Sequence, residues 1–259
     1  MQNLTFSLIQ FDQAWEDKKA NISKIERFIK EYVPHETDVI VLPEMFTTGF
    51  SMKPSALAEA PDGESFHWMK QTASALNKAL CGSLIIKEKG KYYNRFYFIQ
   101  PDGNYYCYNK RHLFTMAGEH HQYTAGMEKL VFVYKDFRIC PMICFDLRFP
   151  AWNRNLEDYD VLLIVANWPE KRIAHWDPLI IARAIENQSY VVAVNRVGPD
   201  GNGTPHNGHS MAVDPMGKII AFAADHETVL TFSIQKDTIE TTRKNLPFLH
   251  ERDNFLMKD

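Results

Sequence analysis

Residues 137–150 have the sequence Phe-Arg-Ile-Cys-Pro-Met-Ile-Cys-Phe-Asp-Leu-Arg-Phe-Pro, and this stretch decides how the rest of the chain is interpreted. Its first seven residues are mostly apolar and predict a strand. Cys144 closes that strand, and a short polar segment leading toward a helix follows it. Such a turn exposes the sulfur and places backbone N–H groups beside it, which suits a nucleophile. Free cysteines are also commonly buried in cores, so this stretch alone leaves both roles open.

The segments on either side of this stretch alternate between strand and helix patterns. Further strands are predicted at residues 4–10, 39–42, 84–87, 92–99, 105–109, 130–134, 161–166, 190–195, 209–213 and 218–222. Helices are predicted at residues 17–32, 64–80 and 175–188, and residues 198–208 are predicted to be a flexible loop. This alternation is typical of an α/β protein with layers of helix over sheet. Because no repeat or linker interrupts it, residues 1–259 are expected to form one domain.

The composition restricts the function classes. Of the 259 residues, 29 are Lys or Arg and 32 are Asp or Glu, so the net charge of −3 gives no indication of a nucleic-acid or polybasic membrane partner. The longest apolar runs, residues 161–166 and 219–224, are too short to cross a bilayer. No secretory signal is evident at residues 1–4. Four cysteines in so long a chain indicate free thiols, so a cytoplasmic protein is expected.

Three chemically useful residues follow predicted strands in order along the chain. Glu44 comes after residues 39–42, Lys110 after residues 105–109, and Cys144 after residues 137–143. Taken singly, Glu44 has an ordinary interpretation as a loop carboxylate, Lys110 as a solvated cation and Cys144 as a core thiol. Open α/β sheets, however, place ligand sites at the C-terminal ends of their strands. Together the three indicate a base, a cation and a nucleophile in one site.

The remaining cysteines and the histidines give weaker signals. Cys81, Cys107 and Cys140 are interpreted as buried core residues. No pair of cysteines has C-x-x-C spacing, which argues against a thiol redox protein. The ten histidines include no H-E-x-x-H motif, so no metal site is predicted.

With these residues in place, the chain resembles the nitrilase, or carbon–nitrogen hydrolase, superfamily over essentially its whole length. The resemblance rests on residues 42–44 (Leu-Pro-Glu), 109–114 (Asn-Lys-Arg-His-Leu-Phe) and 144–150 (Cys-Phe-Asp-Leu-Arg-Phe-Pro), with support from residues 182–187 and 208–210. It implies a four-layer α-β-β-α sandwich and a homodimer or larger oligomer. Residues 110–114, 116–120 and 166–169 resemble, more specifically, the bacterial omega-amidase branch.

The resemblance also implies a mechanism, which is amide hydrolysis through a thioester on Cys144. Glu44 would act as the general base and then as the acid. Glu119 matches a second glutamate of the family, which orients the catalytic residues. Lys110 and the backbone N–H of Phe145 would hold the oxyanion. No metal or organic cofactor is required, and the expected small-molecule partner is an amide.

For the omega-amidase branch, the implied substrates are omega-amides of dicarboxylates, such as 2-oxoglutaramate and succinamate. A buried substrate carboxylate needs a cation, and the candidates are Arg148 and Arg172, with Trp168 as an apolar wall. The alternative role of Arg148 is a structural ion pair with a buried carboxylate such as Asp146. The alternative for Arg172 is a solvated loop cation. Alternative functions are hydrolysis of a nitrile or an N-carbamoyl amino acid by the same residues, or a catalytically silent binding role.

Overall fold

The first strand, β1 (Asn3–Gln10), has apolar residues on both faces because it lies between two layers of the protein. Successive side chains of a strand point to opposite faces. Leu4, Phe6 and Leu8 accordingly enter a core between two sheets, whereas Ile9 enters a second core beneath helices. Thr5 and Ser7 also lie on the face away from the sheet–sheet core, where they are buried and form hydrogen bonds with the hydroxyls of Ser233 and Thr231.

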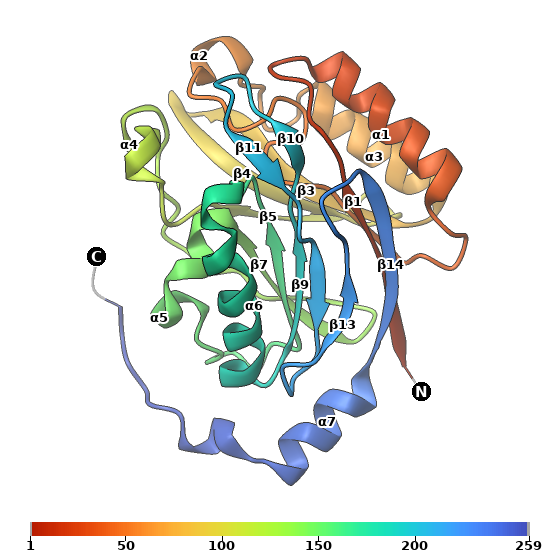
Figure 1. The fold of residues 1–259 in the computed structure, drawn as a ribbon, viewed down its shortest axis with the longest axis vertical. Coiled ribbons are helices and arrows are strands. Elements are labelled where there is room, and N and C mark those ends of the chain that lie inside the picture. Colours follow the sequence, from red (N-terminus) through yellow and green to blue (C-terminus); the bar gives the residue numbers. More distant parts are fainter. Residues whose placement is uncertain (1, 258–259) are drawn as a thin grey trace.

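The computed structural model describes residues 2–257, and within them the strands form two six-stranded sheets and a two-stranded ribbon (Figure 1). The first sheet has the order β14-β1-β2-β3-β4-β5, with β14 (Thr228–Gln235), β2 (Val39–Val41), β3 (Ala79–Glu88), β4 (Lys91–Ile99) and β5 (Tyr105–Asn109). The second has the order β13-β12-β9-β8-β7-β6, with β13 (Ile219–Phe222), β12 (Met211–Val213), β9 (Tyr190–Val194), β8 (Val161–Val165), β7 (Phe137–Ile143) and β6 (Phe132–Tyr134). The ribbon pairs β10 (Val197–Pro199) with β11 (Pro205–Asn207).

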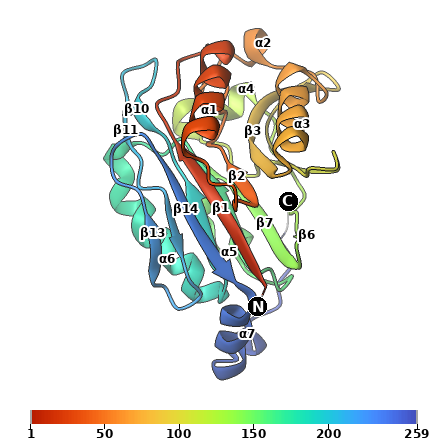
Figure 2. The ribbon, with the colours of Figure 1, turned by 90° about the vertical axis from the view of Figure 1, so that its right-hand side faces the viewer.

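Helices cover the outer faces of the two sheets. Helices α1 (Lys18–Tyr32) and α3 (Glu64–Leu76) pack on the first sheet, and α6 (Ile173–Asn187) packs on the second (Figure 2). The other helices are α2 (Pro54–Leu57), α4 (Glu119–Gln122), α5 (Pro150–Asn153) and α7 (Lys236–Asn245). This arrangement confirms the predicted four-layer α-β-β-α sandwich. Among residues 2–257, no helix is both long enough and apolar enough to cross a membrane.

The chain closes its first sheet with its last strand. β1 pairs with β2 in parallel on one side. On the other side it pairs antiparallel with β14 along its whole length, from Asn3 opposite Gln235 to Gln10 opposite Thr228. Neither β14 nor α7 is predicted from the sequence.

Three local predictions are wrong. The helix predicted at residues 64–80 ends at Leu76, because Asn77 adopts the left-handed conformation (φ 53°) and β3 begins two residues later. The predicted loop at 198–208 is instead the β10–β11 ribbon. Its turn is held by Asp200, whose carboxylate accepts hydrogen bonds from the backbone N–H groups of Asn202 (2.8 Å) and Thr204 (2.9 Å). Cys107 is exposed rather than buried, because it lies on the edge strand β5.

Candidate active site

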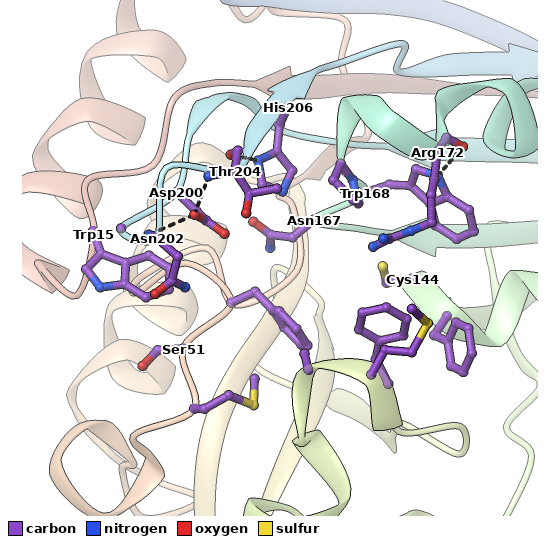
Figure 3. A pocket seen from close by; sticks show the side chains of 18 of the residues that line it. Trp15, Ser51, Cys144, Asn167, Trp168, Arg172, Asp200, Asn202, Thr204 and His206 are labelled. Atoms are coloured by element: carbon purple, nitrogen blue, oxygen red, sulfur yellow. Dashed lines mark hydrogen bonds between the residues drawn. The ribbon is translucent and has the colours of Figure 1, made fainter.

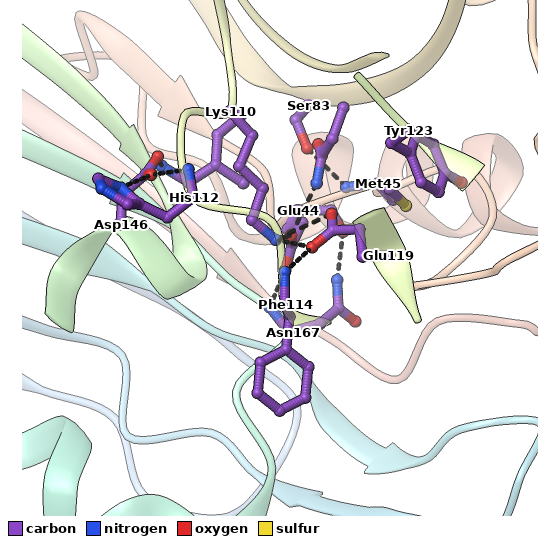
Figure 4. A network of polar contacts seen from close by, with 12 residues as sticks. Glu44, Met45, Ser83, Lys110, His112, Phe114, Glu119, Tyr123, Asp146 and Asn167 are labelled. Atoms are coloured by element: carbon purple, nitrogen blue, oxygen red, sulfur yellow. Dashed lines mark hydrogen bonds and ion pairs between the residues drawn. The ribbon is translucent and has the colours of Figure 1, made fainter. Parts of the chain in front are cut away.

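The three residues singled out in the sequence meet where strands of the two sheets end. Glu44 follows β2 and Lys110 follows β5 in the first sheet, whereas Cys144 follows β7 in the second. All three contribute to one buried polar cluster or to the cavity beside it (Figures 3 and 4). Packing the sheets face to face therefore brings together residues that are as many as 100 positions apart, from Glu44 to Cys144.

Lys110 lies between two buried carboxylates (Figure 4). Its Nζ donates to Glu44 Oε1 at 2.8 Å and to Glu119 Oε1 and Oε2 at 3.1 and 3.0 Å. The three side chains are at most 1% exposed. Burial alone would lower the pKa of Lys110, but the charges of Glu119 and Glu44 outweigh it and raise the pKa. Lys110 therefore remains a cation at neutral pH.

Glu119 is brought to the cluster by the loop that follows Lys110. It begins the short helix α4, after Gly118 has turned the chain in the left-handed conformation (φ 74°). Its carboxylate also accepts a hydrogen bond from the backbone N–H of Phe114, at 2.5 Å. Burial raises the pKa of Glu119, the Lys110 cation opposes this rise, and Glu44 adds to it. Glu119 is thus the second carboxylate that fixes the position of the Lys110 ammonium.

The Glu44 carboxylate is held on both of its oxygens. Oε1 accepts from Asn94 Nδ2 at 2.8 Å as well as from Lys110, and Oε2 accepts from the backbone N–H of Asn167 at 2.9 Å. The Glu44 carbonyl oxygen accepts from the side-chain amides of Gln13, at 3.1 Å, and Asn167. These contacts give the carboxylate one orientation.

Cys144 begins a 3₁₀ turn, Cys144–Arg148, and has a left-handed backbone (φ 45°) that is uncommon for a residue with a side chain. Burial raises the pKa of its thiol well above the usual value, and the neighbouring Glu44 carboxylate raises it further. Lys110 and the backbone N–H of Asn167 act in the opposite direction. The resting thiol is therefore protonated beside a carboxylate that can take its proton.

Asp146 holds the strained turn in place. Oδ2 accepts from the backbone N–H of Ile143 at 3.1 Å and from the hydroxyl of Tyr108 at 2.8 Å. Oδ1 accepts from the backbone N–H of His112 at 2.8 Å. Asp146 thus ties the Cys144 turn to the loop that carries Lys110. Its oxygens are taken up by these donors, so the alternative in which Arg148 pairs with Asp146 is wrong.

A cavity of about 560 Å³ opens in front of Cys144 (Figure 3). The walls beside the thiol are largely aromatic, and the far end is formed by Trp15, Ser51 and the β10–β11 ribbon. Phe145, Arg148, Trp168 and Arg172, which the sequence analysis singles out, all line the cavity, as do Lys110 and Cys144. The first N–H groups of a helical turn have no partner within it, and the backbone N–H of Phe145 occupies such a position beside the thiol.

Sequence reasoning missed the residues that support this site. Asn94 lies within the predicted strand at 92–99 and was not singled out, and Tyr108, in the strand at 105–109, was given no role. A lone asparagine inside an apolar strand is the signal that could have identified Asn94, because a buried amide needs a partner. The ribbon could not have been identified in this way, since its glycines and prolines are typical of loops.

Comparison with known proteins agrees with the fold. The family model for carbon–nitrogen hydrolases matches residues 5–244. The chain is 42% identical over 258 residues to the omega-amidase YafV of Yersinia enterocolitica, covering 99% of this chain and 100% of that one. It is 35% identical over 251 residues to the 2-oxoglutaramate amidase of Bacillus subtilis, covering 94% and 95%.

A crystal structure shows the same similarity. A CN-hydrolase superfamily protein from Xanthomonas campestris, with an arsenic adduct in its active site, matches with a TM-score of 0.96 and 36% identity over 100% of both chains. The family model and these relatives, together with the two sheets and their flanking helices, identify the chain as a hydrolase of carbon–nitrogen bonds. The chain belongs to the carbon–nitrogen hydrolase family, which confirms the resemblance found in the sequence, and it is an enzyme.

Replacing Glu44 with glutamine is expected to lower the pKa of the Cys144 thiol. Glutamine removes the negative charge that raises this pKa but keeps a similar shape. The thiolate should then form at a lower pH, as measured by its ultraviolet absorbance in a titration, corrected with the same variant lacking Cys144. Lys110→Met is the opposing control, because removing this cation should raise the thiol pKa. An unchanged or higher pKa in the Glu44→Gln variant would contradict this description of the site.

Proposed function

We propose that this enzyme hydrolyses the omega-amide of small dicarboxylate monoamides, such as 2-oxoglutaramate or succinamate, to an acid and ammonia. The observation that carries the proposal is a pair of arginines, Arg148 and Arg172, on the wall of the cavity that holds Cys144. The similarity to an omega-amidase and to a 2-oxoglutaramate amidase supports it.

The surroundings of both arginines support a role in binding an anion. The Arg148 guanidinium lies 4.6 Å from the centre of the Trp168 ring, and its Nη2 is 3.0 Å from His175 Nδ1. The Arg172 guanidinium lies 4.8 Å from the centre of the Phe114 ring. Burial lowers the pKa of Arg148, and the positive charge of Arg172 lowers it further. Within the described part of the chain, neither arginine forms an ion pair, so two neighbouring cations face the cavity without an anionic partner.

The reaction proposed for this site proceeds through a thioester. Glu44 takes the proton of the Cys144 thiol as the sulfur attacks the amide carbon, and the former carbonyl oxygen becomes an oxyanion. The Lys110 ammonium and the backbone N–H of Phe145 stabilise that oxyanion. When the C–N bond breaks, the nitrogen takes the proton from Glu44 and leaves as ammonia. Glu44 then takes a proton from water, whose oxygen attacks the thioester. When the C–S bond breaks, the acid leaves and the sulfur regains that proton from Glu44. Glu119 positions Lys110 throughout.

Replacing Arg172 with methionine is expected to raise KM for succinamate about tenfold or more while leaving butyramide nearly unaffected. Losing a charge-assisted hydrogen bond to the substrate carboxylate has this effect, and butyramide has no carboxylate. Steady-state ammonia release from the two amides measures both values. Equal changes for the two amides would remove Arg172 from carboxylate recognition, and Arg148→Met would then be the variant expected to discriminate between them. If neither variant discriminates, the proposed substrate class is wrong.

A further inference from the structure

His112 lies in the loop that carries Lys110, and its side chain reaches the turn that carries Cys144 (Figure 4). Nδ1 of its ring is 2.8 Å from Asp146 Oδ1, the same oxygen that accepts the backbone N–H of His112. A carboxylate oxygen only accepts hydrogen bonds, so Nδ1 must carry the hydrogen. His112 therefore donates two hydrogen bonds to one oxygen of Asp146.

The imidazole ring of His112 also packs against the end of this turn. It stacks on the Phe149 ring, with the ring centres 3.7 Å apart and the planes 7° from parallel. The Phe149 ring meets the Phe145 ring edge-on, with the centres 5.1 Å apart. The backbone N–H of Phe149 donates to the carbonyl oxygen of Asp146 at 3.1 Å and closes the turn. One side chain of the loop thus contacts both the middle and the end of the turn.

Asp146 depends on these contacts because its carboxylate is fully buried. A buried carboxylate is stable only when donors meet its oxygens. Oδ2 accepts from Tyr108 and from the backbone N–H of Ile143, whereas in the described part of the chain both donors to Oδ1 come from His112. Without the ring N–H, Oδ1 would keep a single donor, and the orientation of the carboxylate would be less restrained.

The restraint matters because the turn is strained. Cys144 has a left-handed backbone, and a residue with a side chain stays in that conformation only when its surroundings hold it there. The proposed mechanism also needs groups from both segments, namely the sulfur and the Phe145 N–H from the turn and the Lys110 ammonium from the loop. A displacement of about 1 Å between such groups can lower a rate about a hundredfold.

We propose that His112 is a positioning residue for the reaction. Its ring N–H, acting through Asp146, fastens the loop that carries Lys110 to the turn that carries Cys144, and this aligns the nucleophile with the two oxyanion donors. The inference rests on the proposed role of Cys144 as the nucleophile, but it is independent of which acyl group binds. His112 does not line the cavity, so its contribution is to the rate and not to substrate binding.

Two substitutions separate the ring N–H from the stacked ring. His112→Phe keeps a flat ring to stack on Phe149 but has no donor, whereas His112→Asn has an NH₂ group in the position of Nδ1 but no ring. Ammonia release from succinamate and butyramide gives kcat and KM, and thermal unfolding verifies that each variant is folded. We expect kcat to fall about 20-fold in His112→Phe, with less than about a twofold change in KM, and no more than about threefold in His112→Asn.

Two further variants serve as controls. Cys140→Ala removes buried packing in β7 but leaves the contacts of His112 intact, so it should lower the melting temperature and retain kcat. His112→Gln replaces His112→Phe if the latter does not fold. Its NH₂ group lies one bond farther from the backbone, so its kcat should be lower than that of His112→Asn.

Three results would overturn the proposal. The first is an equal loss of kcat in His112→Asn and in the variant compared with it. The second is a change confined to KM, and the third is an unchanged kcat in His112→Phe.

An activated ester keeps this inference distinct from the proposed function. Hydrolysis of p-nitrophenyl butyrate needs the same nucleophile and oxyanion donors, so p-nitrophenol release should place the His112 variants in the same order. If wild type hydrolyses the ester but neither amide, the proposed function fails while the ester still decides the role of His112. If Cys144→Ala retains ester hydrolysis, Cys144 is not the nucleophile and this inference fails with that assignment.

Discussion

Replacing Cys144 with alanine is expected to reduce ammonia release from succinamate by about 10⁴-fold or more while leaving the protein folded. The sulfur is the proposed nucleophile, and without it no thioester can form. The side chain is only partly buried, and its removal deletes a single heavy atom, so little packing is lost. The turn itself is held by Asp146 through contacts that alanine does not change. Activity assays and thermal unfolding measure the two effects separately.

Two other cysteines provide matched controls for this prediction. Cys140 is fully buried in β7, so Cys140→Ala should lower stability through a cavity but retain turnover. Cys107 is exposed, so Cys107→Ala should change neither property. Mass spectrometry of a slowly turning-over substrate should find the acyl group on Cys144. Turnover near wild type in a folded Cys144→Ala protein would refute the covalent mechanism proposed here. An adduct on Cys140 would show that Cys144 is not the nucleophile.

Replacing Lys110 with methionine is expected to lower both catalysis and stability. Loss of one oxyanion donor costs about 3 kcal/mol, or roughly a hundredfold in kcat, with less change in KM. The same substitution leaves Glu44 and Glu119 buried without their cation. Breaking a buried ion pair from one side typically destabilises a protein by about 3–5 kcal/mol. Steady-state kinetics and denaturant unfolding test the two expectations.

A second substitution distinguishes the two effects of losing Lys110. Adding Glu119→Gln to Lys110→Met removes one of the two uncompensated charges, so stability should partly recover while kcat stays low. A change confined to KM in Lys110→Met would assign Lys110 to substrate binding instead. Recovery of kcat together with stability in the double variant would show that the loss of rate arises from unfolding.

The parts of the fold that could be predicted from the sequence are those with strong local patterns. The apolar strand ending at Ile143 and the alternation of helix and strand around it are local features, and they indicated an α/β protein and the three residues at strand ends. The four-layer sandwich was implied by the family resemblance. β14 was missed because most of its residues are only partly buried, which weakens the apolar pattern. Its position is determined by pairing with β1, which no local pattern reveals.

The supporting residues of the site were hidden for a similar reason. Asn167 and Asp146 were visible only as members of short motifs, and their partners are as many as 123 positions away in the sequence. Which donor meets which acceptor depends on how the two sheets pack, so the contacts of Asp146 could not be inferred from its neighbour Arg148. The positions of the reactive residues after predicted strands could be found in the sequence. The hydrogen bonds that orient these residues could be identified only in the folded structure.

The pairing of the first strand with the last has a consequence for how the protein is made. Residues 3–10 leave the ribosome long before residues 228–235, the segment that completes their sheet. Until then the newly synthesised β1 has an unpaired edge, which is the kind of surface on which other chains can add a strand. Contacts so distant in sequence also form slowly. The interval between synthesis of the first and last strands is therefore the period in which this chain is most exposed to aggregation and has most to gain from a chaperone.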